Sequence, residues 1–277
     1  MNTISVIGAN GMLGFAVAEY FESRGYAVQR ITHDQFDIVK DPIVNLEKML
    51  FETDVVVNCA GITKEKVRNN SVEDVLKINS IFPRNLTLYC KQAGIKCFHI
   101  TSESVFSGQR GSYSEDDPFD ADDFYSISKN AGECPNCMIL RTSFIGEERE
   151  DSHSLVEWAK GQHGQTVDGL VNHFWNGVTT VYLAEIIEKI LENGAYSEGI
   201  FHIYSPNIVS KKELMELLND VFMLNMSIEP IEGAHYCDRT LTSKYSLSRF
   251  FCTKTIQMQV HEMKEFFELI RTPVITY

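Results

Sequence analysis

The sequence predicts an α/β protein with a Rossmann-type doubly wound parallel sheet and a smaller C-terminal substrate-binding lobe. In the first half of the chain, short β-branched runs alternate with segments whose apolar residues recur at helical spacing. Strands that alternate with helices form parallel sheets covered by helices on both faces. A glycine-rich turn also joins the first strand to the first helix. We therefore expect a nucleotide-binding domain at residues 1–147 and a substrate-binding lobe, partly interleaved with it, at residues 148–277.

The individual elements follow from the apolar patterns in chain order. Strands are expected where apolar and β-branched runs stand between turn residues, and helices where apolar residues are three or four apart. In the first half the expected strands are 3–8, 26–31, 54–61, 96–102 and 137–146, and the expected helices are 11–25, 44–51, 71–94 and one that contains Tyr125. Beyond residue 147 the pattern becomes irregular, with helices expected at 154–162, 180–194 and 210–222 and a strand at 199–204.

The composition indicates a folded protein that binds neither nucleic acid nor membranes. Of the 277 residues, 44% are hydrophobic, which suffices for one sizeable core with a smaller lobe. The formal net charge of −13 argues against nucleic acid and anionic membrane surfaces, because both require a basic face. The first residues carry neither a basic segment nor an unbroken apolar run, so we expect a cytoplasmic protein without a signal peptide or transmembrane helix.

The seven cysteines are odd in number and stand mostly in apolar surroundings, which is typical of reduced core residues. Cys134 and Cys137 have the spacing of half a zinc site, but no second pair of ligands accompanies them. We therefore expect neither a disulfide nor a metal site.

Three glycines in the first turn predict a site for a dinucleotide. Gly8 permits the tight turn, Gly11 lets a pyrophosphate approach the backbone, and Gly14 lets the helix pack on the strand. Their position between a strand and a helix favours this interpretation over a simple glycine-rich turn. The expected cofactor contacts in the turn are Gly8, Asn10, Gly11, Met12, Leu13 and Gly14.

The residues after the second strand bear on the choice between NAD and NADP. An NAD site usually has an acidic residue here for the ribose hydroxyls, but this stretch reads Arg30-Ile31-Thr32-His33. Arg30 or His33 could face a 2′-phosphate, and Arg30 could equally be a solvated strand residue. We expect Thr32 near the ribose and a mild preference for NADP.

Tyr125 and Lys129 form a candidate proton-delivery pair. Residues four apart lie on one face of a helix, so the ammonium can sit near the phenol. A nearby positive charge lowers the pKa of a phenol, which suits a group that must give up a proton near pH 7. The pair is also common by chance, so its interpretation depends on the rest of the chain.

Several motifs together resemble the extended short-chain dehydrogenase/reductase family, and within it the dTDP-4-dehydrorhamnose reductases. The resemblance runs nearly end to end, and its most specific part is the segment from the strand end to the tyrosine. The motifs are GANGMLG, DVVVNCAGIT followed by Asn79, HITSESVFSGQRGSYSEDDPFDADDFYSISKNAGE, LRTSFIGEE and CDRTLTSKYSL. The resemblance implies a reductase that uses NADP or NAD in deoxysugar biosynthesis and acts on the 4-keto group of a nucleotide-linked 4-keto-6-deoxy sugar.

The resemblance assigns roles to the catalytic and remaining cofactor residues. It implies that Ser102 hydrogen-bonds the substrate oxygen, that Tyr125 donates the proton, and that Lys129 assists Tyr125 and holds the nicotinamide ribose. Further cofactor contacts are expected at Asp37, Ile38, Cys59, Ala60 and Gly61. Asn79 is a polar residue in an apolar helix, and it either supports the active site or braces the neighbouring strand.

The substrate side departs from the family pattern. The family usually has D-Y-V-F-D-G where this chain has Glu103-Ser-Val105-Phe106-Ser-Gly, so these residues predict a different sugar pocket. The related 4,6-dehydratases carry an Asp-Glu pair at the position of Glu103-Ser104. Ser104 stands where the dehydratases have the carboxylate that acts as base, so the sequence argues against a dehydratase.

The second half supplies candidate substrate contacts in NHFWNGVT and CDRTLTS. Aromatic rings stack on sugars and amides pair with hydroxyls, so Asn172 and Trp175 are expected in a substrate wall, unless this loop only caps the helix that follows. Arg239 is expected at the diphosphate of a nucleotide sugar, although a surface arginine would also fit.

Two other functions remain open. The regulatory subunit of methionine adenosyltransferase resembles the same reductases, so a non-catalytic cofactor-binding subunit is one alternative. A nucleotide-sugar epimerase that uses bound NAD transiently is the other. The presence of Ser102, Tyr125 and Lys129 favours a reductase. The oligomeric state stays open, with a homodimer as one option.

Overall fold

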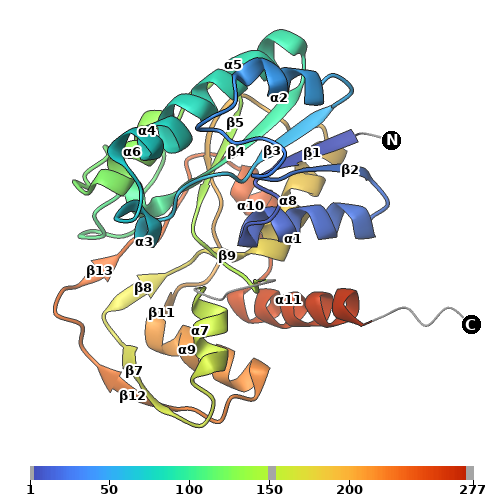
Figure 1. The fold of residues 1–277 in the computed structure, drawn as a ribbon. Coiled ribbons are helices and arrows are strands. Elements are labelled where there is room, and N and C mark those ends of the chain that lie inside the picture. Colours follow the sequence, from blue (N-terminus) through green and yellow to red (C-terminus); the bar gives the residue numbers. More distant parts are fainter. Residues whose placement is uncertain (1–2, 149–153, 273–277) are drawn as a thin grey trace, which may run out of the picture.

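The computed structural model describes residues 3–148 and 154–272 (Figure 1). Its centre is a six-stranded sheet in the order β10-β5-β4-β3-β1-β2, and every neighbouring pair of strands is parallel. This confirms the expected fold class. No helix in the described ranges is long and apolar enough to cross a membrane.

The first half contains the strands and helices of the nucleotide-binding domain, in places close to those expected. The strands are β1 Thr3–Ile7, β2 Ala27–Ile31, β3 Val55–Asn58, β4 Lys96–Ser102, β5 Met138–Thr142 and β6 Phe144–Ile145. The helices are α1 Met12–Ser23, α2 Ile43–Met49, α3 Lys64–Val67, α4 Val72–Leu76, α5 Phe82–Ala93 and α6 Phe124–Gly132, with a π-helical turn at Lys77–Ile81 and a 3₁₀ turn at Glu103–Val105.

Only part of the second half forms a separate lobe. Its helices are α7 Leu155–Gly161, α8 Thr180–Glu192, α9 Lys211–Phe222, α10 Leu247–Phe251 and α11 Ile256–Arg271. Its strands are β7 Thr166–Leu170, β8 His173–Trp175, β9 Val178–Thr179, β10 Gly199–His202, β11 Val209–Ser210, β12 Ser227–Ile231 and β13 Cys237–Asp238. Strand β10 adds to the edge of the central sheet beside β5, and α8 packs on α1. The chain thus returns to the central sheet and to α1 after residue 177.

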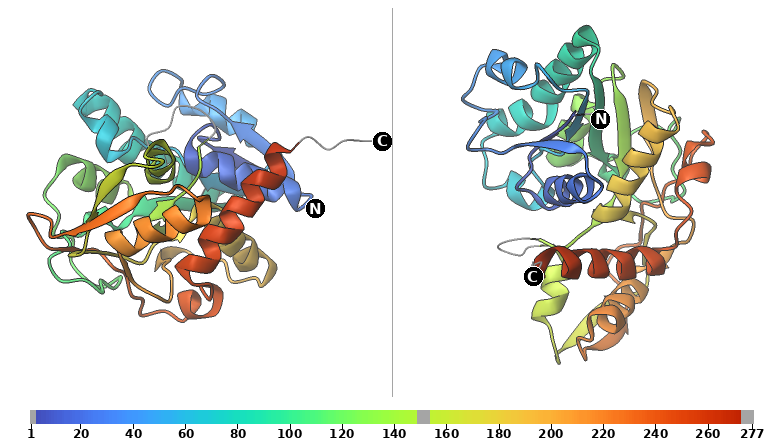
Figure 2. Two further views of the ribbon diagram at one scale, coloured as in Figure 1. Left: turned by 90° about the horizontal axis from the view of Figure 1, so that it is seen from below. Right: turned by 90° about the vertical axis from the view of Figure 1, so that its right-hand side faces the viewer.

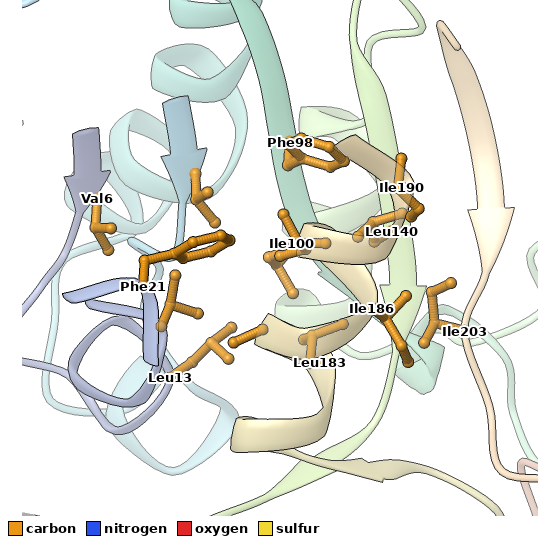
Figure 3. Packing of buried hydrophobic residues seen from close by; sticks show 14 of the residues in the cluster. Val6, Leu13, Phe21, Phe98, Ile100, Leu140, Leu183, Ile186, Ile190 and Ile203 are labelled. Atoms are coloured by element: carbon orange, nitrogen blue, oxygen red, sulfur yellow. The ribbon is translucent and has the colours of Figure 1, made fainter. Parts of the chain in front are cut away.

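Helices cover both faces of the central sheet. On one face, α1 and α8 bury apolar side chains such as Phe21 and Ile186 against Phe98 and Leu140 of the strands (Figure 3). On the other face, α2 and α5 bury Leu46 and Leu86. Each such side chain contributes roughly 1.5–3 kcal/mol when it leaves water, so this packing fixes the strand ends that carry the candidate site.

The small lobe lies below the sheet domain and is joined to it through α11 (Figures 1 and 2). It contains α7, α9 and the pairs β7–β12, β8–β11 and β8–β13. Helix α11 buries Val260 and Phe267 in the same apolar cluster as Leu214 and Leu218 of α9 and Ala16 of α1. This shared core fixes the lobe against the sheet domain, so the space between them is preformed.

Candidate active site

The strands of the central sheet end along one edge, where three cavities lie side by side. Parallel strands place their carboxyl ends together, and ligands of open α/β sheets bind there. A cavity of about 350 Å³ follows β1 and β2, and we call it the adenosine-side cavity because the sequence predicts the adenosine half of a dinucleotide there. The central cavity of about 520 Å³ follows β3, β4 and β5, and the outer cavity of about 410 Å³ opens toward the small lobe. We use these three names below.

Ser102, Tyr125 and Lys129, predicted from the sequence as one constellation, all line the central cavity. Ser102 is the last residue of β4. Its Oγ donates a hydrogen bond to Glu103 Oε2 at 3.1 Å and accepts one from the backbone N–H of Ser104 at 3.1 Å. The hydroxyl is therefore held in place by the turn that follows the strand.

Helix α6 carries Tyr125 in its first turn and Lys129 one turn later. The helix begins after Asp123, whose carboxylate accepts a hydrogen bond from the backbone N–H of Ser126 at 3.1 Å. The same carboxylate lies 2.9 Å from Lys64 Nζ at the start of α3. This N-cap fixes where the helix starts and so fixes the position of Tyr125.

The electrostatics of Tyr125 differ from the sequence expectation. We expected the Lys129 charge to lower the pKa of the phenol, but burial raises that pKa above its ordinary value. A hydrogen bond with Ser102 opposes the increase, and the Glu103 carboxylate adds to it. The phenol consequently keeps its proton until a stronger base, such as an alkoxide, forms beside it. That property suits a proton donor in a reduction.

Lys129 is a buried ammonium beside neutral groups. Its Nζ donates to the carbonyl oxygen of Ile100 at 3.3 Å, and only 6% of the residue is exposed. Burial lowers the pKa of Lys129 to about 8, and the carboxylate of Glu133 partly offsets this effect. Burial and the Lys129 charge also lower the pKa of His99 well below its ordinary value, so that imidazole is neutral.

The helix expected at 71–94 contains a π-helical turn, and Asn79 lies inside it. Such turns insert one extra residue and often occur at functional sites. The Asn79 side chain accepts from Ile62 N–H at 2.8 Å and donates to Ser128 Oγ at 3.1 Å. It thereby ties the loop after β3 to helix α6. Of the two roles that the sequence left open for Asn79, this geometry favours support of the active site.

The glycine turn after β1 fits a dinucleotide. Gly8 has φ +78°, and a Cβ there would lie 2.9 Å from the backbone nitrogen of Ala60. A Cβ at Gly14 would lie 2.2 Å from the carbonyl oxygen of Gly8. Helix α1 begins at Met12 with neither a side-chain cap nor an acidic residue in its first turn. Its first N–H groups are thus available to a pyrophosphate.

Replacing Gly11 by valine should weaken cofactor binding without unfolding the protein. A Cβ at Gly11 would meet only the carbonyl oxygen of Gly8 at 3.4 Å, and φ is −76°, so the fold can accept the side chain. The branched side chain would occupy the space that a pyrophosphate needs. Titration with NADH and NADPH should show at least about 10-fold weaker binding.

A matched control for this variant is Gly161→Val, because a Cβ there meets no atom within 4 Å and the position is far from the turn. Unchanged affinity of Gly11→Val for both cofactors would remove the turn from the cofactor site.

The adenosine-side cavity contains most of the expected residues near the ribose and adenine. Its lining includes Asn10, Thr32, His33, Ile38, Ala60 and Phe36, the last of which the sequence did not single out. Asp37 does not line it, because its carboxylate pairs with Lys40 Nζ at 2.9 Å. Arg30 is also outside the cavity lining: its guanidinium pairs with Glu19 at 2.7 Å and Glu22 at 2.8 Å. This ion pair corrects the suggestion that Arg30 faces a 2′-phosphate.

The remaining cofactor candidates divide between the cavities. Cys59, Ala60 and Gly61 line both the adenosine-side and the central cavity, and Leu13 lines the central one. Met12 and Gly14 lie in α1 and do not line the cavities described above. Gly14 therefore serves the packing of helix on turn.

Three of the expected substrate residues face the cavities and three do not. Glu103 and Arg239 line the central and outer cavities, and Trp175 lines the outer one. Val105 and Phe106 are buried in an apolar cluster with Tyr113 and Leu241. The Asn172 side chain donates to the carbonyl oxygen of Gly233 at 3.0 Å and does not line the outer cavity. These three residues therefore line neither the central nor the outer cavity.

The cavity residues that the sequence did not indicate include Ser143, Phe174 and Lys211. Ser143 and Lys211 line both the central and the outer cavity, and Phe174 lines the outer one. Phe174 lies in the same aromatic motif as the expected residues Asn172 and Trp175. Lys211 is the first residue of an amphipathic helix, and the sequence carries no signal that this position faces a cavity.

Known proteins resemble this chain in sequence and in fold. The family model described as RmlD substrate binding domain matches residues 1–272. A dTDP-4-dehydrorhamnose reductase of Mycolicibacterium smegmatis is 25% identical over 75% of this chain and 65% of its own length. One of Mycobacterium tuberculosis is 25% identical over 87% of this chain and 83% of its own. A dTDP-4-dehydrorhamnose reductase of Bacillus anthracis, solved in complex with NADP, superposes with a TM-score of 0.77 at 20% identity, covering 98% of this chain and 99% of its own.

Proposed function

Because the chain belongs to the RmlD substrate binding domain family, we propose that it is an NAD(P)H-dependent reductase of a nucleotide-linked 4-keto-6-deoxy sugar in deoxysugar biosynthesis. The observation that carries this proposal is the meeting of Ser102, Tyr125 and Lys129 at one cavity. This cavity adjoins the glycine turn through Cys59, Ala60 and Gly61, which it shares with the adenosine-side cavity. Relatives named as reductases of dTDP-4-keto sugars support the same reaction.

The cavity residues can supply the hydrogen bond and the proton that the carbonyl oxygen needs in a ketone reduction. The reduced nicotinamide, when bound, supplies a hydride to the carbonyl carbon. Ser102 Oγ would donate a hydrogen bond to the substrate oxygen in place of the one it gives Glu103. Tyr125 then protonates that oxygen as negative charge develops on it, and a preorganised donor pair of this kind stabilises the transition state. Lys129 would hold the nicotinamide ribose.

The outer parts of the substrate would lie toward the small lobe. Trp175 offers an apolar ring face at the outer cavity, and Arg239 offers a guanidinium between the two cavities. An arginine binds phosphate oxygens with two donors in a fixed plane. Glu103 lies beside both Ser102 and Arg239, and burial raises the pKa of its carboxyl group. The sugar would therefore contact a residue that differs from the usual aspartate.

NADPH is proposed as the preferred cofactor because the adenosine-side cavity offers Thr32 and His33, but no carboxylate, after β2. Thr32→Asp should shift the ratio of kcat/KM toward NADH by about 10-fold, since a carboxylate repels a 2′-phosphate and accepts hydrogen bonds from ribose hydroxyls. Steady-state kinetics with both cofactors measures this ratio.

Thr32→Asn provides the control for that change, because it alters the side chain to a similar extent without adding charge. The placement of the ribose would have to be abandoned if the aspartate variant kept the parent ratio.

The function is tested by incubating the purified protein with NADPH, then NADH, and a panel of 4-keto-6-deoxy nucleotide sugars, while the absorbance of the reduced cofactor is followed. Loss of absorbance with formation of the 4-hydroxy-6-deoxy sugar supports a reductase. Cofactor binding without turnover on the whole panel supports the regulatory-subunit alternative. Epimerised product without net loss of reduced cofactor supports the epimerase. A homodimer stays a prediction.

A further inference from the structure

The outer cavity and the central cavity meet at four residues: Glu103, Ser143, Lys211 and Arg239. Two of these are cations in a chain of net charge −13. They come from segments that the small sheet β11-β8-β13 brings together. With the single carboxylate of Glu103, the junction carries a local excess of positive charge that the overall composition does not suggest.

The register of this sheet places the two cations on opposite sides of β8. Ser210 of β11 pairs with Phe174, and Asp238 of β13 pairs with Phe174 from the other side. Lys211 and Arg239 each follow directly after these residues. Because β11 is antiparallel and β13 parallel to β8, Lys211 lies level with His173 and Arg239 with Trp175. Their backbones are therefore two inter-strand spacings apart across the sheet and two residues apart along β8, or about 12 Å. A ligand with two neighbouring anionic groups can span such a gap between long side chains.

Lys211 has no hydrogen bond or ion pair with any described residue, although it lines both cavities. Its position is nevertheless fixed, because Ser210 and Glu213 form a capping box at the start of α9. The next residue, Lys212, forms an ion pair with Glu216 on the same helix. Lys212 is thus paired along the helix, whereas Lys211 faces the cavities.

Arg239 is held by its stem and leaves its terminal nitrogens free for a ligand. Its Nε donates to the carbonyl oxygen of Phe106 at 2.8 Å. A Cβ added to Gly108 would lie 3.0 Å from the Arg239 Cγ, so the absence of a side chain at Gly108 lets the arginine stem pass. Among the described residues, neither terminal nitrogen has a hydrogen-bond partner.

We propose that Lys211, together with Arg239, binds the diphosphate of the substrate at the junction of the two cavities. The sugar then extends toward Ser102 and Tyr125, and the nucleoside lies against Phe174 and Trp175 in the outer cavity. This inference rests on the proposed function and adds a specificity residue to it. A monoanionic ligand would engage one cation and leave the other unpaired, whereas a diphosphate engages both, so the junction favours nucleoside diphosphates.

Lys211→Met tests the inference by removing the charge and keeping the length of the side chain. Binding of dTDP and UDP, measured by isothermal titration in the presence of NADPH, should weaken by about 10-fold, the usual cost of losing one charged partner. Binding of thymidine, which has no phosphate, should be unaffected. On a reducible substrate, KM should rise by a similar factor with much less change in kcat, and Lys211→Arg should restore most of the affinity.

Lys212→Met is the matched control, because it causes the same loss of charge one residue away and should leave dTDP affinity, UDP affinity and KM at parent values. The inference is overturned if Lys211→Met and Lys212→Met behave alike, or if the parent binds neither nucleoside diphosphate. A parent that reduces its substrate with a KM unaffected by Lys211→Met would retain the proposed function and lose this subsite. A parent that binds dTDP or UDP through Lys211 but reduces nothing would retain the subsite and lose the proposed function.

Discussion

Replacing Tyr125 by phenylalanine should reduce turnover on the order of 10²–10⁴-fold, the usual contribution of a positioned general acid. The ring would still pack at the start of α6, and both ligands should still bind. The substrate oxygen would lose its proton donor, and Ser102 cannot replace it, because an aliphatic hydroxyl can donate a hydrogen bond to that oxygen but is no more acidic than the alcohol that forms. Single-turnover reduction with saturating NADPH measures the loss directly.

The matched control is Tyr89→Phe, which removes a phenol that donates to the carbonyl oxygen of Glu47 at 3.0 Å, far from the cavities. Its turnover should equal that of the parent. Near-normal turnover in Tyr125→Phe would mean that the YSISK segment is structural, and the regulatory-subunit alternative would then gain most.

The candidate site was predictable wherever function is encoded in short, continuous stretches. Gly8 adopts φ +78°, and Gly14 allows α1 to pack closely on the turn, so both positions require glycine and the residue types alone predict this turn. Ser102 ends a strand with a clear apolar pattern, and Tyr125 and Lys129 share one helix. Because parallel strands end at one edge, these separate stretches had to meet there.

The parts that the sequence did not predict depend on contacts between distant segments. Strands β11 and β13 have two residues each, which is too short to show any periodicity, so the pairing that brings Lys211 and Arg239 to β8 has no local signal. The ion pairs of Arg30 with α1 also depend on tertiary packing. Likewise, the π-helical turn at Asn79 interrupts an apolar pattern that reads as one continuous helix.

Helix α11 is a different case, because the sequence does contain the apolar periodicity that predicts it. Ile256, Val260, Met263 and Phe267 recur at helical spacing and are all buried. The expected elements nevertheless did not include this helix. Its omission left the small lobe without the element that joins it to α1 and α8, and so hid the reason why the two halves form one preformed site.

Replacing Lys129 by methionine should lower cofactor affinity and turnover together while making the protein more stable at pH 7. The ammonium is buried, and among the described residues its hydrogen-bond acceptor is the Ile100 carbonyl oxygen at 3.3 Å. Methionine has a similar shape and no charge, so the burial penalty disappears. Without the ammonium, the nicotinamide ribose would lose a hydrogen-bond donor, and we expect turnover to fall by at least about 100-fold.

The stability gain should depend on pH in a defined direction. An unfolded lysine has a pKa of about 10.4, whereas burial lowers the pKa of Lys129 to about 8. Below that value the charged form is buried and the full penalty applies, which amounts to at most about 3 kcal/mol. As the pH rises from about 8 toward 10.4, the folded protein releases the proton before the unfolded chain does, so the penalty decreases. Loss of the hydrogen bond to Ile100 offsets about 1 kcal/mol of the gain.

Urea unfolding of the parent and of Lys129→Met at pH 7 and at pH 10 measures this difference. We expect the variant to exceed the parent by about 1–2 kcal/mol at pH 7 and by less at pH 10. Lys64→Met is the control, since this exposed lysine pairs with Asp123 and should change stability little. A variant that is less stable than the parent at pH 7 would show that Lys129 is well solvated in the folded protein. Unchanged NADPH affinity would remove Lys129 from the ribose, because losing a hydrogen-bond donor to a ribose hydroxyl has to weaken binding.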